Sequence, residues 1–170
     1  MKQKSPTYIS LFSSAGIGCY GFKLEKFECV ATNELIKRRL DIQRFNNKCK
    51  YESGYICGDI TQECIKNALY EQINLWKRKE NLSRVDVVVA TPPCQGMSVA
   101  NHKKSKTEII RNSLVVESIK IIKEINPRFF IFENVPAFMK TICTDIDGNV
   151  KSIAEAIENN LGNRIHIYHE

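Results

Sequence analysis

The hydrophobic positions of this chain follow two patterns that alternate along its length. Short runs rich in apolar, β-branched and aromatic residues predict strands at 8–12, 28–32, 55–57, 85–90, 129–132 and 164–168. Apolar residues at helical spacing predict helices at about 20–26, 35–45, 61–79, 113–125 and 150–160. Because strands that alternate with helices form βαβ units, we expect an α/β fold with a doubly wound, mostly parallel sheet.

Local signals indicate where several of these helices begin and end. Thr61 belongs to the residue types that cap helix N-termini. Asn126-Pro127 ends a helix, because proline restricts the residue before it, and Asp147-Gly148-Asn149 predicts a turn before the last helix. The sequence shows no internal repeat and no low-complexity linker. We therefore expect a single domain over residues 1–170.

A glycine-rich segment follows the first predicted strand and opens a helix. Gly16, Gly18 and Gly21 allow a sharp turn and a close approach of the backbone to a ligand. Glu34 ends the second predicted strand and could accept hydrogen bonds from ribose hydroxyls, and Asp59 ends the third and could hold an adenine amine. Each residue also has a purely structural interpretation, as part of a turn or as a helix cap. Together they favour a nucleoside cofactor, either a dinucleotide or S-adenosylmethionine.

A cysteine follows the fourth predicted strand. Pro92 and Pro93 stop that strand and stiffen the turn that carries Cys94, at the end of the sheet where open α/β folds bind ligands. Glu133 ends the neighbouring fifth strand, so we expect Cys94 and Glu133 to face one pocket. This pairing suggests a nucleophile beside a general acid or hydrogen-bond anchor. The alternatives are an inert thiol in a stiff turn and a strand-end carboxylate.

Composition narrows the class of protein. The content of 43% hydrophobic and 26% charged residues is ordinary for a globular protein, and the net charge of +6 permits a polyanionic partner without requiring one. The seven cysteines include no C-x-x-C pair, which argues against a disulfide framework or a zinc site. No apolar run is long enough to cross a bilayer, and no signal peptide is evident. We therefore expect a cytosolic protein without a metal or a membrane partner.

Taken together, these motifs resemble the N-terminal, catalytic portion of the cytosine-5 DNA methyltransferases. The resemblance spans about residues 8 to 140. It rests on Phe12-Ser13-Ser14-Ala15-Gly16-Ile17-Gly18, Asn33-Glu34, Gly58-Asp59-Ile60, Pro92-Pro93-Cys94-Gln95-Gly96-x-Ser98, Arg111-Asn112-x-Leu114 and Glu133-Asn134-Val135. The element around Cys94 is highly specific. The resemblance selects S-adenosylmethionine over a nicotinamide or flavin cofactor.

The resemblance implies a Rossmann-like methyltransferase fold and methyl transfer to carbon 5 of cytosine in double-stranded DNA. Cys94 would form a covalent intermediate with the base, and Glu133 would steady the ring. The residues that it assigns to the cofactor are Phe12, Ser14, Ala15, Gly16, Ile17, Gly18, Glu34, Asp59, Ile60, Pro92, Asn112 and Leu114. The residues that it assigns to the substrate are Pro93, Gln95, Gly96, Ser98, Asn134 and Val135.

The chain also departs from the family pattern. We find no Gln-x-Arg-x-Arg element, no target-recognition domain and no late helix that would close the cofactor pocket. We therefore expect a sheet that is incomplete at its C-terminal end and a catalytic half that needs a complementing part or subunit. A truncated chain, one subunit of a split enzyme and a decayed gene product all fit this pattern. The alternative functions are a non-catalytic module that binds cofactor or a partner, a tRNA cytosine-5 methyltransferase and, last, a dehydrogenase.

Overall fold

The computed structural model describes residues 5–93 and 106–162, and for residues 106–113 it describes the backbone alone. The chain divides into two compact units. The first holds the chain up to Thr91 together with Asn126–Phe132, and the second holds Pro92–Ile125 together with the chain from Glu133 on. The single domain expected over residues 1–170 stays a prediction.

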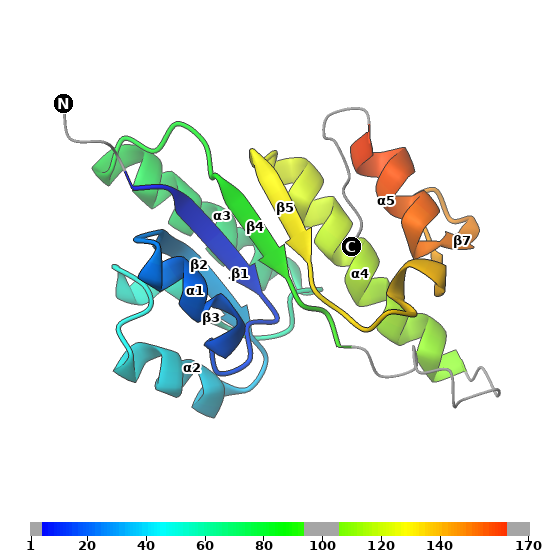
Figure 1. Ribbon diagram of the computed structural model, residues 1–170, viewed down its shortest axis with the longest axis horizontal. Helices are drawn as coiled ribbons and strands as arrows, with labels where there is room; N and C mark the ends of the chain where they lie inside the picture. The colour runs from blue at the N-terminus through cyan, green and yellow to red at the C-terminus, as the bar shows by residue number, and fades with distance from the viewer. Residues whose placement is uncertain (1–4, 94–105, 163–170) are drawn as a thin grey trace. The chain divides into compact units, whose positions relative to one another are not determined.

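The first unit is built around a parallel sheet with the strand order β3-β2-β1-β4-β5 (Figure 1). Its strands are β1 (Thr7–Leu11), β2 (Glu28–Glu34), β3 (Tyr55–Cys57), β4 (Val87–Ala90) and β5 (Phe129–Phe132). Central β1 is buried along its whole length, as a strand covered on both faces must be. The strand order reverses at β1, so the carboxyl ends of β1 and β4 form the edge where such sheets bind ligands.

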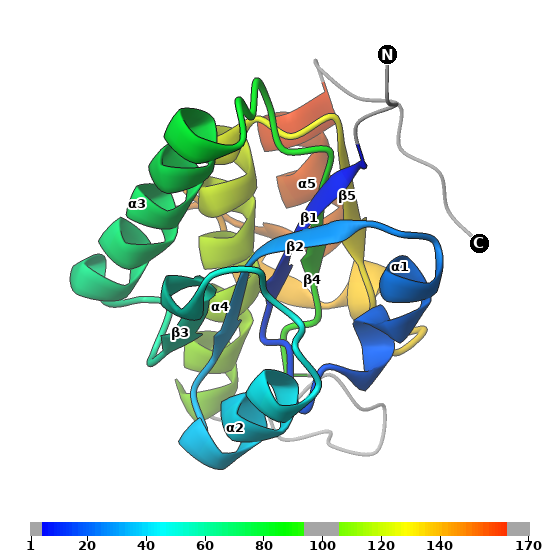
Figure 2. The same ribbon diagram turned by 90° about the vertical axis from the view of Figure 1, so that its left-hand side faces the viewer.

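Helices cover both faces of this sheet. The short α1 (Tyr20–Leu24) and the long α3 (Glu63–Lys79) lie on opposite faces (Figures 1 and 2). Along α3 the buried stripe includes Leu69, Ile73 and Trp76, which follow the i, i+4, i+7 spacing of an amphipathic helix. Burying side chains of this size contributes about 1.5–3 kcal/mol each. This arrangement confirms the predicted α/β fold with a parallel, Rossmann-like sheet.

Shorter elements connect these strands and helices. The turn η1 (Ile17–Cys19) precedes α1, and α2 (Lys37–Phe45) follows β2. A second turn, η2 (Glu52–Gly54), leads into β3. The helix α2 buries Leu40 and Gln43, three positions apart, and is otherwise largely exposed, including its apolar residues Ile42 and Phe45.

The second unit packs α4 (Lys106–Ile125) against a small hairpin and against α5 (Ile153–Leu161). The hairpin pairs β6 (Ile142–Thr144) with β7 (Val150–Ser152) in antiparallel fashion, and the turn η3 (Phe138–Lys140) precedes it. In the hairpin, Cys143 is buried, whereas Ile142 and Val150 are exposed. The hairpin therefore contributes Cys143 to the core of this unit.

Polar contacts fix the hairpin and the start of α5. The Lys151 ammonium donates to Asp145 at 2.9 Å and to Asp147 at 2.6 Å, and the Asp145 carboxylate is buried. Ser152 and Glu155 form a capping box at the start of α5, in which each side chain accepts from the other residue's backbone N–H. The capping box satisfies backbone N–H groups that have no partner within the first turn of α5.

The structure corrects the predicted start of two helices. Thr61 does not cap α3, which begins at Glu63 with Gln62 as its N-cap. The reason is that the Thr61 backbone N–H and its hydroxyl both donate to Asp59 Oδ1, at 2.9 and 2.8 Å. Val150–Ser152, predicted as the first turn of the last helix, pairs instead as β7.

Two further boundaries also differ from the prediction. The strand predicted at 85–90 begins at Val87, and the helix predicted at 113–125 begins at Lys106. The strand predicted at 164–168 lies outside the described residues. Among the described residues, none of the helices combines the length and the apolar character needed to span a bilayer.

Candidate cofactor edge and active site

The loop that follows β1 has an unusual backbone. Phe12 and Ser14 have φ angles of 56° and 49°, and Gly16 has a φ of 86°. The left-handed region is free to glycine but costs other residues about 1–2 kcal/mol each. Two non-glycine residues in this region within three positions require neighbours that hold them there. Strain of this kind is typical of sites that are preorganised for a ligand.

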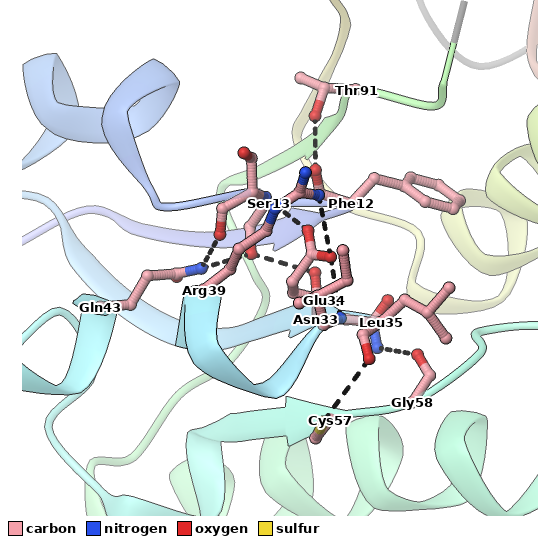
Figure 3. Close-up of polar contacts among 12 residues, drawn as sticks. Phe12, Ser13, Asn33, Glu34, Leu35, Arg39, Gln43, Cys57, Gly58 and Thr91 are labelled. Carbon is pink, nitrogen blue, oxygen red and sulfur yellow. Dashed lines mark hydrogen bonds and ion pairs between the residues drawn. The ribbon is translucent and has the colours of Figure 1, made fainter. Parts of the chain in front are cut away.

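The neighbouring strand ends supply those contacts (Figure 3). The backbone N–H and the hydroxyl of Ser13 both donate to the Asn33 carbonyl at the end of β2, at 2.9 and 3.0 Å. The Ser14 N–H donates to Glu34 Oε2 at 2.8 Å. On the other side, the Thr91 hydroxyl after β4 donates to the Phe12 carbonyl at 3.0 Å. The loop is therefore clamped from both strands that flank β1.

Glu34 holds several neighbouring groups in addition to the ribose hydroxyls that the sequence suggested it could bind. Its carboxylate is buried and accepts hydrogen bonds from the Ser14 N–H, from the Ile36 N–H at 3.0 Å and from Arg39 at 3.4 Å. The Ile36 contact lies at the start of α2, so the alternative interpretation as a helix-end carboxylate describes part of its role. A carboxylate has about four acceptor positions, which leaves capacity for a ligand hydroxyl.

The loop after β3 is also fixed from β2. The Asn33 side-chain amide donates to the Ile56 and Gly58 carbonyls, at 3.2 and 3.1 Å. Gly58 has a φ of 146°, and a Cβ atom there would lie 2.5 Å from the Ile65 side chain, so only glycine fits. Asp59 uses Oδ1 to hold Thr61, whereas its Oδ2 has no hydrogen-bond partner among the described residues. That oxygen can accept an amine donor.

The three glycines of the motif differ in whether a side chain would fit at their positions. Gly16 needs both its positive φ and its missing side chain, since a Cβ atom would lie 3.0 Å from Gln43 Cγ. Gly18 and Gly21 have open space where a Cβ would stand. The Ile17 side chain is exposed, and the Ile60 side chain is buried, so Ile60 could offer a ligand only its backbone.

Sequence reasoning missed three residues that shape this edge: Asn33, Gln43 and Thr91. Asn33 and Gln43 are both buried, and each contacts the loop after β1. A signal was present for Asn33 and Gln43, because Asn33 is a polar residue inside a buried strand and Gln43 occupies a core-facing position of α2. Buried polar groups require hydrogen-bond partners, so such positions point to tertiary contacts.

The candidate active-site segments begin where β4 and β5 end. In the second unit, the Asn134 side-chain amide donates to the Pro92 carbonyl at 2.8 Å, and Asn134 Oδ1 accepts the Val135 N–H. This contact joins the segment two residues before Cys94 to the segment next to Glu133. The Glu133 side chain is exposed and Pro93 is exposed, whereas Pro92 is buried.

Several predicted site residues cannot be placed. Cys94, Gln95, Gly96 and Ser98 lie outside the described residues, as does the side chain of Asn112. The expected approach of Cys94 to Glu133 therefore stays a prediction. Leu114 lies in α4 and is half-buried. Among the described residues, no group of three or more histidine, cysteine or acidic side chains could hold a metal ion.

Comparison with known proteins decides the family. The family model described as C-5 cytosine-specific DNA methylase matches residues 7–162. The chain belongs to this family. The match includes all the strand ends described above and both segments joined by Asn134.

Related proteins of known type cover most of this chain. The Type II methyltransferase M1.HgaI of Avibacterium volantium is 34% identical over 163 residues, which make up 94% of this chain and 43% of that protein. M.AquIA of Picosynechococcus sp., also named a Type II methyltransferase, is 32% identical over 127 residues, or 75% of this chain and 47% of that protein. The chain thus spans less than half the length of these relatives.

A solved structure shares the fold. It is described as a DNA modification methyltransferase encoded within a prophage of E. coli, and it superposes with a TM-score of 0.61 at 21% sequence identity. The match covers 94% of this chain and 38% of that one. At this identity the likeness supports the fold alone.

Proposed function

We propose that this chain is the catalytic half of an S-adenosylmethionine-dependent DNA cytosine-5 methyltransferase, completed by a further polypeptide segment or subunit. The observation that carries the proposal is the strained loop after β1, clamped by β2 and β4 at the ligand-binding edge of a sheet that belongs to this family. Strain that is held by several neighbours is expected at a preorganised ligand site.

The residues at this edge suit an adenosine group. Glu34 retains acceptor capacity for ribose hydroxyls, and Asp59 Oδ2 can accept the adenine amine. Phe12 is half-buried and can pack against a flat ring, while Gly16 lets the backbone turn without a side chain in the way. S-adenosylmethionine would supply an electrophilic methyl group. Ser14, Ala15, Ile17, Gly18, Ile60, Pro92, Asn112 and Leu114 complete the proposed cofactor set.

Cys94 and Glu133 are proposed to act on the base. Neutral cytosine is a poor nucleophile at carbon 5, so a covalent step is needed before methylation. The Cys94 thiolate adds to carbon 6, and Glu133 binds nitrogen 3 and the amino group, which supports the charge that develops on the ring. Carbon 5 would then take the methyl group as the sulfonium S–CH3 bond breaks and leaves a neutral thioether. Transfer of the carbon 5 proton to a base would expel the thiolate and restore the ring.

The base must leave the duplex for this chemistry. Flipping costs roughly a few kcal/mol of stacking and pairing, which contacts to the sugar-phosphate backbone offset. Pro93, Gln95, Gly96, Ser98, Asn134 and Val135 are the residues proposed to lie nearest the DNA. Of these, Asn134 already holds the backbone of the segment that carries Cys94.

A complementing polypeptide is the second part of the proposal. Its support is the short span of the chain relative to its relatives and the apolar surface of the first unit. Ile17, Leu24 and Phe45 are 82%, 63% and 86% exposed, and Phe129 on the edge strand β5 is 63% exposed. Among the described strands β5 pairs only with β4. Exposed apolar side chains and an unpaired strand edge are features suited to association.

Methyl transfer from tritiated S-adenosylmethionine tests the function. The chain would be assayed alone and with the C-terminal portion of the M1.HgaI relative, with duplex DNA or tRNA as acceptor. We expect no turnover from the chain alone, turnover on DNA with the added portion, and none in a Cys94→Ala variant. Turnover that survives Cys94→Ala would exclude Cys94 as the nucleophile, and transfer to tRNA alone would exclude the DNA assignment.

A further inference from the structure

Gln43 is a buried side chain that no motif of the family explains. It lies in α2, is 1% exposed, and points back toward the loop after β1 (Figure 3). Its Nε2 donates to Ser13 Oγ at 2.8 Å and to the Ser14 carbonyl at 2.6 Å. Its Oε1 accepts from Thr32 Oγ1 at 2.8 Å. Both amide hydrogens and the amide oxygen are thus engaged.

The surrounding groups fix which way this amide faces. Lys48 Nζ donates to Thr32 Oγ1 at 3.1 Å, so the Thr32 hydrogen is free to point at Gln43 Oε1. The Ser13 hydroxyl donates to the Asn33 carbonyl, so its oxygen accepts from Gln43. A flipped amide would place an oxygen against the Ser14 carbonyl, which offers no hydrogen. Only one orientation satisfies every group.

Gln43 also packs against the loop. A Cβ atom at Gly16 would lie 3.0 Å from Gln43 Cγ, so the glycine leaves the space that the glutamine stem fills. Gln43 therefore contacts the loop at Ser13, Ser14 and Gly16, and two of these three residues have positive φ angles. Without its donor, the Ser14 carbonyl would lose the partner that offsets the strained backbone at that residue.

We propose that Gln43 is a positioning residue of the cofactor site, which holds the loop after β1 in the conformation that binds S-adenosylmethionine. This inference rests on the proposed function and extends it to a residue that does not touch the cofactor. Gln43 acts through Ser14 and Gly16, whose backbone would meet the ligand. Its contribution should be measurable as a higher affinity for the cofactor and as slower hydrogen exchange of the amides in the loop after β1.

The chain offers a matched control for this proposal. Gln72 in α3 is also buried, donates through Nε2 to the Val30 carbonyl at 3.0 Å and accepts from Ser53 at 2.7 Å. Among the described residues, neither of these hydrogen-bond partners of Gln72 lies in the loop after β1. Gln43→Met and Gln72→Met each remove one buried amide while keeping a side chain of similar length. A general loss of stability should appear in both variants, and a positioning effect in the first alone.

Two measurements on the full chain test the proposal. Hydrogen exchange without cofactor should show faster exchange of the Ser13, Ser14 and Gly16 amides in Gln43→Met, with β1 and β4 unchanged. Calorimetric titration with S-adenosylmethionine should show about tenfold weaker binding in Gln43→Met, on the scale of lost hydrogen bonds, and no change in Gln72→Met.

A Gln43→Glu variant adds a signature that loss of packing cannot produce. The carboxylate cannot donate to the Ser14 carbonyl, whereas its protonated form can. The ratio of its dissociation constant to that of the wild type should therefore fall as the pH is lowered from 8 to 5.5. A pH-independent ratio, or equal effects of Gln43→Met and Gln72→Met, would overturn the inference.

The proposed function and this inference fail in different ways. If the wild-type chain binds no S-adenosylmethionine, the cofactor assignment fails, and the inference that depends on it fails with it. If the wild type binds and Gln43→Met binds equally well, the cofactor assignment stands and Gln43 has no positioning role.

Discussion

Replacing Glu34 with glutamine tests whether the end of β2 holds the loop after β1. The Glu34 oxygens accept N–H groups from Ser14 at 2.8 Å, Ile36 at 3.0 Å and Arg39 at 3.4 Å. Glutamine keeps the shape but turns one acceptor into a donor, so one backbone N–H meets an NH2 group whichever way the amide faces. Hydrogen bonds to charged groups contribute about 1.5–3 kcal/mol, and we expect a loss of about 2–4 kcal/mol in the free energy of unfolding.

Urea unfolding at constant pH measures this loss. The midpoint should fall while the slope stays unchanged, because the variant exposes no additional surface on unfolding. Glu63→Gln is the matched control, since Glu63 is exposed and, among the described residues, forms an ion pair only with Lys66 one turn away at 3.2 Å, a type of contact that contributes about 0–1 kcal/mol. Equal, small effects of both substitutions would refute the claim that Glu34 restrains Ser14.

Two further predictions concern the amino end of the sheet, where β1 and β4 begin, and the loop after β3. The Asp86 carboxylate accepts hydrogen bonds from the Thr7 N–H and hydroxyl and forms an ion pair with Arg128. Partial burial alone would raise the pKa of Asp86, but these contacts outweigh it and lower the pKa below its ordinary value. The ionised carboxylate therefore stabilises the fold at pH values above the unfolded pKa, and this stabilisation is lost as the pH falls. Asp86→Asn should lower the free energy of unfolding by about 1–3 kcal/mol at pH 7, and its difference from wild type should shrink toward pH 3 in urea titrations. A difference that stays constant with pH would contradict this reasoning. Gly58→Ala should lower the thermal unfolding midpoint sharply, because the new Cβ atom would lie 2.5 Å from an α3 side chain at a backbone position with a φ of 146°. Gly18→Ala should leave the midpoint unchanged, because a Cβ atom there meets open space. Equal shifts of the midpoint would show that the two glycines contribute equally to stability.

The central strands β1 and β4 were predictable because they are buried along their whole length. Residues such as Val87, Val88 and Val89 form uninterrupted apolar runs, which indicate a strand in a parallel sheet without any knowledge of its partners. The hairpin of the second unit was not predicted. Its strands Ile142–Thr144 and Val150–Ser152 are three residues long, too short to show a period of two. Of this hairpin, the sequence predicted only the turn at Gly148.

Residues of the candidate site were predictable where they belong to a sequence motif. They were not predictable where their role depends on a contact with a distant part of the chain. Glu34 and Asp59 stand at strand ends in the expected positions. The Thr61 cap was wrong because Asp59 captures the Thr61 hydroxyl, a competition that the residue types alone do not decide. Gln43 lies 30 residues from Ser13, which it binds, so no local pattern could connect them. Three-dimensional contacts of this kind explain most of what the sequence left open.

The central claim is that Cys94 adds covalently to the cytosine ring. The most direct test traps this adduct on duplex DNA that contains 5-fluorocytosine, in which the fluorine blocks the final elimination. The chain would be supplied with S-adenosylmethionine and the complementing C-terminal portion, and the digested complex analysed by mass spectrometry. The account predicts DNA attached to the peptide that carries Cys94 and no adduct in Cys94→Ala. An adduct on any other residue, or one that survives Cys94→Ala, would contradict it.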